Sequence, residues 1–348
     1  MSAGTAILET FHRAAGQFVA ADDMKRHAKI SSAILATEIA DLEKLGYVIE
    51  SHPHFGYRLL GTPDRLSADE IKARLKATSF TGPNAFPDWS RLQIASRIPQ
   101  IIGAEILVFE ETASTNDVVE QLGKAGAREG LVVFAESQTK GRGRHGRTWT
   151  SPRGKGLWFS ILLRPKLSRA VMSRITVAAS VAVAQAIRQT CRLDARIKWP
   201  NDVLMNGRKL AGVLVEVGTR EPRNDYLVLG IGIDVNCTAK DFPPEVAKTT
   251  TSLQMESGQA QDRVALAAVV LQALDMCYAA AQEDFDTLID QWAQLSSTLG
   301  KQIVVRMGTR QIEGHVQALD SDGALLLRRD NGQIERIVGG DVVAERVQ

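Results

Sequence analysis

The chain has 348 residues, of which 44% are hydrophobic and 24% charged, and its formal net charge is +2. This composition supplies ample apolar material for a core and excludes a wholly disordered, collagen-like or low-complexity protein. At about 150 residues per domain, two or three domains are expected. The longest nearly uncharged apolar stretch, residues 175–187, is too short for a membrane helix of ~20 residues, and the N-terminus lacks the basic-then-apolar order of a signal peptide. We therefore expect a cytoplasmic protein with no membrane partner.

The cysteines exclude two kinds of site. Cys191, Cys237 and Cys277 are widely spaced and form no CxxC pair. Neither a disulfide framework nor a structural zinc site is expected.

The chain divides by pattern into four segments. Residues 1–62 predict helices at 6–14, 21–28 and 31–45 and a hairpin at 47–60, which is the order of a winged helix-turn-helix. Residues 63–104 predict a linker with one connecting helix, which Ser67 caps ahead of Glu70. Residues 105–297 predict a sheet built largely from hairpins, with helices, and residues 298–348 predict four or five short strands in a small SH3-like barrel. The predicted fold class is α+β, not an alternating Rossmann pattern.

The main chemical signal is a glycine-rich basic loop. Residues 138–155 contain six Lys and Arg, no Asp or Glu, and interleaved glycines, which favours an anionic ligand. Residues 141–146 fit G-x-G-x-x-G, but residues 147–152 cannot open a helix and no acidic residue follows at the required distance. NAD is therefore not expected, and no P-loop motif is present. A solvated basic loop or a nucleic-acid patch is the alternative interpretation.

Two further clusters accompany the loop. Lys198 ends an apolar strand just before Pro200. Its side chain would either extend to the surface or hold a fixed charge beside a substrate. Asn201 or Asp202 is available to a hydrated Mg²⁺ ion. Ser114, at a strand-to-helix junction, is a helix cap, a ligand contact or both.

Five motifs in order resemble those of biotin protein ligases, and the resemblance extends from residue 105 to the C-terminus. Residues 1–60 resemble the DNA-binding domain of bifunctional, repressor-type members. The motifs lie at residues 114–116, 138–149, 198–202, 209–216 and 230–234.

The resemblance implies ATP-dependent formation of biotinyl-5'-adenylate and transfer of biotin to a lysine of biotin carboxyl carrier protein, with Mg²⁺ as the expected metal. It implies Lys198 and Arg144 as catalytic residues. It also implies operator DNA as a partner and a ligand-promoted homodimer. The implied biotin-binding residues are Ser114, Thr115, Asn116, Gln138, Arg142, Gly143, Arg144 and Lys198; the implied ATP or adenylate contacts are Arg144, Arg147, Trp149, Lys198 and Asn201; Asp202 is the candidate Mg²⁺ ligand; and the implied DNA contacts are Ser31, Ser32 and Thr37.

Some features depart from the family pattern. Asp234 stands where the family usually has Asn, and its carboxylate would either repel phosphate or help to hold a cation. Residues 78–89 look like an insertion. Residues 1–66 carry seven Lys and Arg against eight Asp and Glu, so weak DNA binding by a monomer is expected. A biotin sensor with little turnover, a ligase with a silent helix-turn-helix, and a lipoate or octanoate transferase are the competing interpretations.

Overall fold

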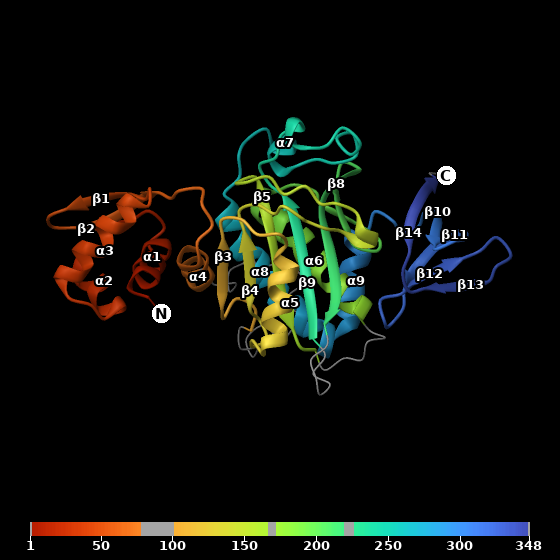
Figure 1. Cartoon of the computed structure of the whole chain (residues 1–348), viewed down its shortest axis with the longest axis horizontal. Helices are drawn as coiled ribbons and strands as arrows, with labels where there is room; N and C mark the ends of the chain where they lie inside the picture. Colours follow the sequence, from red (N-terminus) through yellow and green to blue (C-terminus); the bar gives the residue numbers. More distant parts are fainter. Residues whose placement is uncertain (1, 78–100, 166–171, 219–225, 347–348) are drawn as a thin grey trace. The chain divides into compact units, whose positions relative to one another are not determined.

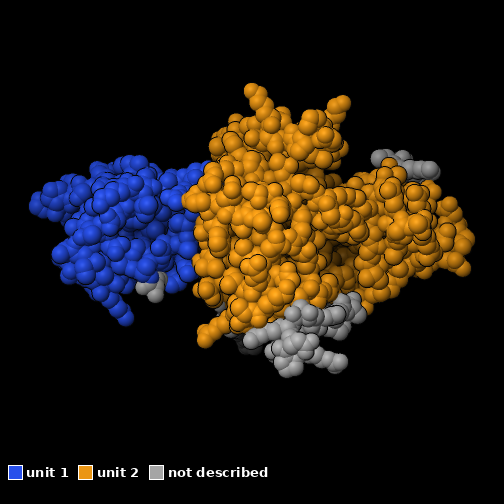
Figure 2. Space-filling view, in the orientation of Figure 1, with its two compact units in different colours: residues 1–85, 262–269 blue, residues 86–261, 270–348 orange. Residues whose placement is uncertain are grey.

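The computed structural model describes residues 2–77, 101–165, 172–218 and 226–346. The chain forms two compact units, one of residues 1–85 with 262–269 and one of residues 86–261 with 270–348 (Figure 2). The suggested insertion at 78–89 lies outside the described residues.

The first unit begins with three helices and a hairpin (Figure 1). The helices surround a buried apolar cluster that includes Phe11, Met24 and Leu35. Ile34 in the first turn of the third helix and Leu45 at its C-cap are exposed, although their spacing would place them on the same helix face as the buried Leu35. The elements are α1 (Ala3–Arg13), α2 (Ala21–Ala28), α3 (Ser32–Lys44), β1 (Val48–His52) and β2 (Gly56–Gly61).

Helix α1 begins three residues before its predicted start. The Ser2 hydroxyl accepts a hydrogen bond from the Thr5 N–H at 3.0 Å and so satisfies a backbone donor of the first turn. Helix α2 ends as expected at Ala28, where Lys29 takes a left-handed conformation with φ 54°.

Helix α4 (Ala68–Ala77) packs against α1 through a buried charge. As predicted, the Ser67 hydroxyl accepts the Glu70 N–H, at 3.1 Å. The Glu70 carboxylate accepts hydrogen bonds from His12 at 2.8 Å, Tyr47 at 3.1 Å and Arg74 at 2.7 Å. Burial raises the pKa of Glu70, but the hydrogen bonds and charges of His12 and Arg74 outweigh that effect and lower it.

The second unit is built on a seven-stranded mixed sheet of order β3-β4-β5-β9-β8-β7-β6. Strands β3 and β4 are parallel and all other neighbours antiparallel, as the hairpin-rich pattern predicted. β5 is buried at every position, and β9 at all but one, which explains their continuous apolar sequences. The strands are β3 (Ile106–Phe109), β4 (Val132–Ala135), β5 (Gly156–Leu163), β6 (Arg196–Lys198), β7 (Asp202–Met205), β8 (Arg208–Gly218) and β9 (Tyr226–Asp234).

Helices cover this sheet. α5 (Thr115–Ala125) packs on β4, β5 and β9, whereas α6 (Met172–Cys191) packs on β6, β7, β8 and α9 (Phe285–Leu295). Contrary to the expectation that no apolar stretch is long enough to cross a membrane, helix α8 (Arg263–Glu283) meets that requirement in length and composition, but 78% of its most apolar window is buried inside the protein. It is therefore a core helix. The short α7 (Leu253–Ser257), capped by Ser252, was not predicted because five residues are too few to show a helical period.

The C-terminal strands form a separate antiparallel sheet of order β13-β12-β11-β10-β14. Five strands agree with the expected four or five. The strand β14 pairs with β10, so it forms one edge of this sheet. The strands are β10 (Gln302–Met307), β11 (Arg310–Leu319), β12 (Leu325–Arg328), β13 (Ile334–Ile337) and β14 (Asp341–Arg346).

The buried Glu70 yields a stability prediction. Glu70→Gln removes the carboxylate that His12, Tyr47 and Arg74 share, while Arg74 keeps Asp262 at 2.7 Å, and we expect a loss of about 1–3 kcal/mol from the contact between α1 and α4. Because the pKa of Glu70 is lowered, its contribution is present above about pH 4.5 and disappears as the pH falls through the lowered value. Hydrogen exchange of the α1 and α4 backbone amides in the full chain measures this loss of stability and its pH dependence. Glu43→Gln, at an exposed site on α3, is the control, and equal exchange in the two variants would contradict the prediction.

Candidate active site

A cavity of about 670 Å³ opens in the second unit, and all the residues selected there from the sequence line it. They come from the start of α5, from the glycine-rich loop between β4 and β5, and from the turn between β6 and β7. These residues are Ser114, Thr115, Asn116, Gln138, Arg142, Gly143, Arg144, Arg147, Trp149, Lys198, Asn201 and Asp202.

One corner of the cavity is a network of uncharged polar groups. Gln138 Oε1 accepts hydrogen bonds from the Thr115 N–H at 2.8 Å and the Thr115 hydroxyl at 3.1 Å. Ser160 lies 2.7 Å from Thr115 Oγ1 and also donates to Asn116. Ser114 occupies the N-cap position of α5, but its side chain makes no capping hydrogen bond. This corner is therefore fixed in position before any ligand arrives.

Arg142 is closely paired with two carboxylates. Its guanidinium donates to Glu216 at 3.1 and 2.9 Å and to Asp117 at 2.6 Å, while Asn116 donates to the same Glu216. Burial lowers the pKa of Arg142, but the two carboxylates outweigh burial and raise it. Arg142 thus fastens the loop to the polar corner, and its charge is already neutralised.

Arg144 is held more loosely. Its Nη1 donates to Asn201 Oδ1 and to the Gly340 carbonyl, each at 3.1 Å, and lies 3.6 Å from an Asp341 oxygen. Burial lowers the pKa of Arg144, and the nearby Asp341 and Asp202 do not reverse the effect. Arg147 pairs with Asp341 at 2.6 Å. Arg144 therefore has charge left for an incoming anion, which Arg142 has not.

Trp149 lies flat on the sheet because two glycines make room for it. Gly212 and Gly232 are cross-strand partners on β8 and β9, and a Cβ at Gly232 would come within 2.6 Å of the indole. Lys209 Nζ lies 5.1 Å from the ring centroid. The indole N–H is buried and has no partner among the described residues. The ring is thus a flat wall of the cavity.

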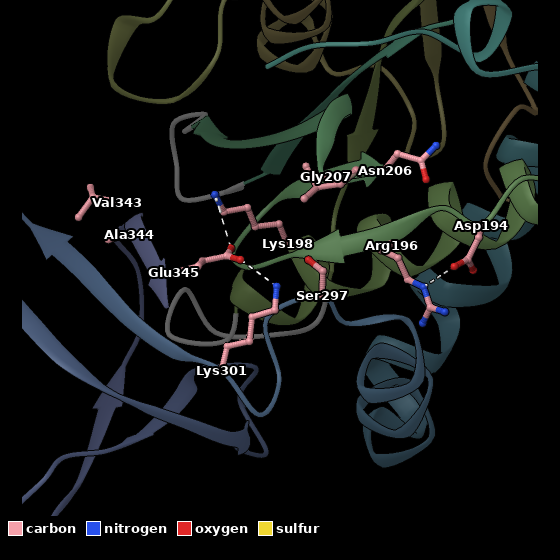
Figure 3. Close-up of a pocket in the computed structure, with 11 residues that line it drawn as sticks. Asp194, Arg196, Lys198, Asn206, Gly207, Ser297, Lys301, Val343, Ala344 and Glu345 are labelled. Atoms are coloured by element: carbon pink, nitrogen blue, oxygen red, sulfur yellow. Dashed lines mark hydrogen bonds and ion pairs between the residues drawn. The ribbon is translucent and has the colours of Figure 1, made fainter. Parts of the chain in front are cut away.

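Lys198 borders a second cavity of about 500 Å³ (Figure 3). Its ammonium lies 3.7 Å from Glu345 of β14, and Glu345 also pairs with Lys301 at 2.9 Å. Figure 3 shows Glu345 between the two lysines. The distance from Lys198 to Glu345 is long for an ion pair, so a substrate anion can compete for Lys198.

The candidate Mg²⁺ ligand is paired with a lysine. The Asp202 carboxylate lies 2.6 Å from the Lys209 ammonium. Among the described residues no group of three or more His, Cys, Asp or Glu side chains could hold a metal ion. Because Mg²⁺ often takes a single carboxylate together with waters and substrate phosphates, the assignment of Asp202 stays a prediction. Asp202 also positions Lys209 beside Trp149.

The sequence reasoning missed several residues of the site. Glu216 belongs to a motif that was recognised, and strand alternation puts it on the same face as Gly212, so the pattern could have revealed it. Asp341 and Glu345 offered no such signal, because they lie about 200 and 150 residues from the loop and Lys198 that they contact.

Comparisons with known proteins agree with this geometry. Residues 108–234 match the Biotin/lipoate A/B protein ligase family, and residues 298–344 match the Biotin protein ligase C terminal domain. The bifunctional ligase/repressor BirA of Bacillus subtilis is 30% identical over 97% of each chain, and BirA of Escherichia coli is 30% identical over 76% of this chain and 82% of its own.

A solved structure is also similar. The biotin protein ligase from Aquifex aeolicus in complex with biotin and ATP superposes with a TM-score of 0.62 and 28% identity, covering 70% of this chain and all of that one. The C-terminal match separates biotin ligases from the lipoate enzymes that the first match also includes. The chain belongs to the biotin protein ligase family.

Proposed function

We propose that the protein joins biotin to ATP as biotinyl-5'-adenylate and then transfers biotin to a lysine of biotin carboxyl carrier protein. The observation that carries this proposal is that a single cavity combines an uncharged polar corner with the loosely paired cations Arg144 and Lys198. In the first step a biotin carboxylate oxygen bonds to the α-phosphorus and pyrophosphate leaves. In the second step the lysine amine attacks the biotinyl carbonyl, loses a proton, and AMP leaves.

The corner suits the uncharged ring of biotin. Its ureido group has N–H donors and a carbonyl acceptor, and Ser114, Thr115, Asn116 and Gln138 provide both kinds of partner. Because Thr115, Asn116 and Gln138 are already held in place by hydrogen bonds among themselves and to Ser160, binding costs little reorganisation. Arg142 and Gly143 close the loop over this end of the ligand, with Arg142 acting through Glu216 and Asp117.

The opposite wall suits the phosphates. Two anions must approach each other in the first step, and preorganised cations reduce their repulsion and stabilise the charge that develops on the phosphoryl oxygens. Arg144 and Lys198 meet this need, with Asn201 orienting Arg144 and the exposed Arg147 lining the same cavity. Trp149 offers a face for adenine. Mg²⁺ would enter with the nucleotide and offset the charge of its phosphates.

We also propose a biotin-responsive repressor role and a cytoplasmic location. The helices and hairpin of the first unit have the order of a winged helix-turn-helix, and the relatives named ligase/repressor support the proposal. Ser31, Ser32 and Thr37 are exposed at the start of α3, although each makes a local hydrogen bond. We further propose that the C-terminal sheet is an SH3-like module.

Lys198→Ala should reduce biotin-dependent pyrophosphate exchange about a hundredfold or more, because it removes a cation beside the reacting oxygens and little core volume. Lys301→Ala is the matched control, since Lys301 shares the Glu345 partner but does not line the larger cavity. Exchange within a few-fold of wild type in Lys198→Ala would refute the assignment.

Arg144→Gly should release biotinyl-adenylate into solution, because the loop loses a cation that retains the phosphate. The released mixed anhydride should biotinylate lysines of added albumin faster than wild type does. Arg153→Gly is the control, because Arg153 does not line the cavity and pairs with Glu110. Equal labelling by Arg144→Gly and wild type would show that Arg144 has no such role.

DNA from upstream of biotin-synthesis genes should shift in a mobility assay only when biotin and ATP are both present. The negative net charge of residues 1–66 makes a single module a weak binder, so two modules in a ligand-promoted dimer are needed. Sedimentation with and without biotin and ATP measures the fraction of the protein that is dimeric. No shift at 50 mM salt and micromolar protein would leave a ligase with a silent first unit.

A further inference from the structure

Asp234 is a buried carboxyl group on the wall of the cavity, and neither step of the proposed ligase reaction uses it. Its side chain is 3% exposed, yet it lines the cavity. Within the described part of the chain its hydrogen-bond partner is Cys237 Sγ, a weak donor at 3.5 Å. A buried carboxyl group with so little support is uncommon and calls for a role.

The position of Asp234 along β9 identifies the end of the cavity that it serves. Every second residue of a strand faces the same side, so Gly230, Gly232 and Asp234 share one face of β9. All three line the cavity. Gly230 lies against Asn116 of the polar corner, and Gly232 lies beneath Trp149. Asp234 is the next residue on that face, roughly 13 Å from Gly230 at ~3.3 Å per residue. A ligand lying along β9 from the polar corner therefore reaches Asp234 with its far end.

The surroundings of Asp234 favour its uncharged form. The nearby cation, Lys209 on β8, is already paired with Asp202 at 2.6 Å. Burial raises the pKa of Asp234 well above its usual range, while Cys237 and Lys209 lower it only in part. Asp241 and Lys155 act on Cys237 from the segments that follow β9 and precede β5.

A neutral carboxylic acid carries an O–H donor beside a C=O acceptor, as an amide does. Adenine presents the complementary pair, a ring nitrogen that accepts beside an amine that donates, whereas guanine presents two acceptors, N7 and O6, at the same edge. The lining of the same cavity includes Trp149, Phe242 and Val246, whose apolar surfaces suit the faces of a base.

We propose that Asp234 selects adenine nucleotides as a neutral acid, donating its proton in a hydrogen bond to a ring nitrogen and accepting one from the exocyclic amine. This inference rests on the proposed use of ATP. From the sequence, the Asp234 carboxylate was expected either to repel phosphate or to help hold a cation. An uncharged acid would do neither.

The experiment measures KM for ATP and for GTP in biotin-dependent pyrophosphate exchange between pH 6.5 and 9.5. As the pH rises, wild type should ionise Asp234, lose the donor and place a buried negative charge beside the nucleotide, so KM for ATP should rise. Asp234→Asn keeps the donor and acceptor, so its KM should stay within a few-fold of the neutral-pH wild-type value and lack the alkaline rise. Asp234→Leu should raise KM for ATP roughly tenfold or more at every pH and reduce the preference over GTP.

Asp241→Asn is the matched control, because it removes a neighbouring carboxylate that does not line the cavity, and it should keep the alkaline rise. An equal alkaline rise in Asp234→Asn and wild type would overturn the proposal.

Calorimetric binding of α,β-methylene ATP by the same variants separates the proposed ligase reaction from the proposed role of Asp234. If wild type catalyses no exchange but binds the analogue with the predicted pH dependence, the proposed reaction fails and this inference stands. Thermal melting identifies any variant that does not fold, and the comparison of Asp234→Asn with wild type then decides.

Discussion

The cavity depends on the absence of side chains at a few positions of the central strands. Gly212, Gly230 and Gly232 lie on β8 and β9, and a Cβ at Gly230 or Gly232 would collide with Asn116 or Trp149. Because close packing leaves no spare volume in a protein interior, even one methyl group at these positions would displace the polar corner or the indole wall. The cross-strand register of Gly212 with Gly232 thus determines where a ligand can lie.

The cations around this cavity carry the same charge but differ in the residues that they pair with. Arg142 faces Glu216 and Asp117 in close hydrogen bonds, whereas Arg144 and Lys198 face carboxylates at 3.6 and 3.7 Å. An arginine with two close carboxylates gains little from a phosphate, because it would first have to give up those contacts. The loop therefore combines an arginine held by two close carboxylates and a more loosely paired arginine only two residues apart.

Much of this organisation could be predicted from the sequence, because it depends on local patterns. Helix and strand positions followed from apolar spacing, glycine and caps, and the motif residues follow or end strands of one sheet. Other features depend on tertiary contacts that no local pattern records. Glu70 had the spacing of a capping box but pairs with His12, Tyr47 and Arg74. The pairing of Asp202 with Lys209 is another contact of this kind. The burial of Asp234, which raises its pKa, likewise depends on contacts that lie far from it in the sequence.

The contacts of β14 constrain how the C-terminal sheet can be exchanged between relatives. This strand presents Asp341 to two arginines of the loop and Glu345 to Lys198, so one edge strand carries both counter-charges for a cavity built mainly by another sheet. A chimaera that brought in a C-terminal sheet with neutral or basic residues at these two positions would lose the carboxylates that pair with the cations of the cavity. The charges of the two segments therefore form a matched set, and a recombination point between them has to preserve both ends of each pair.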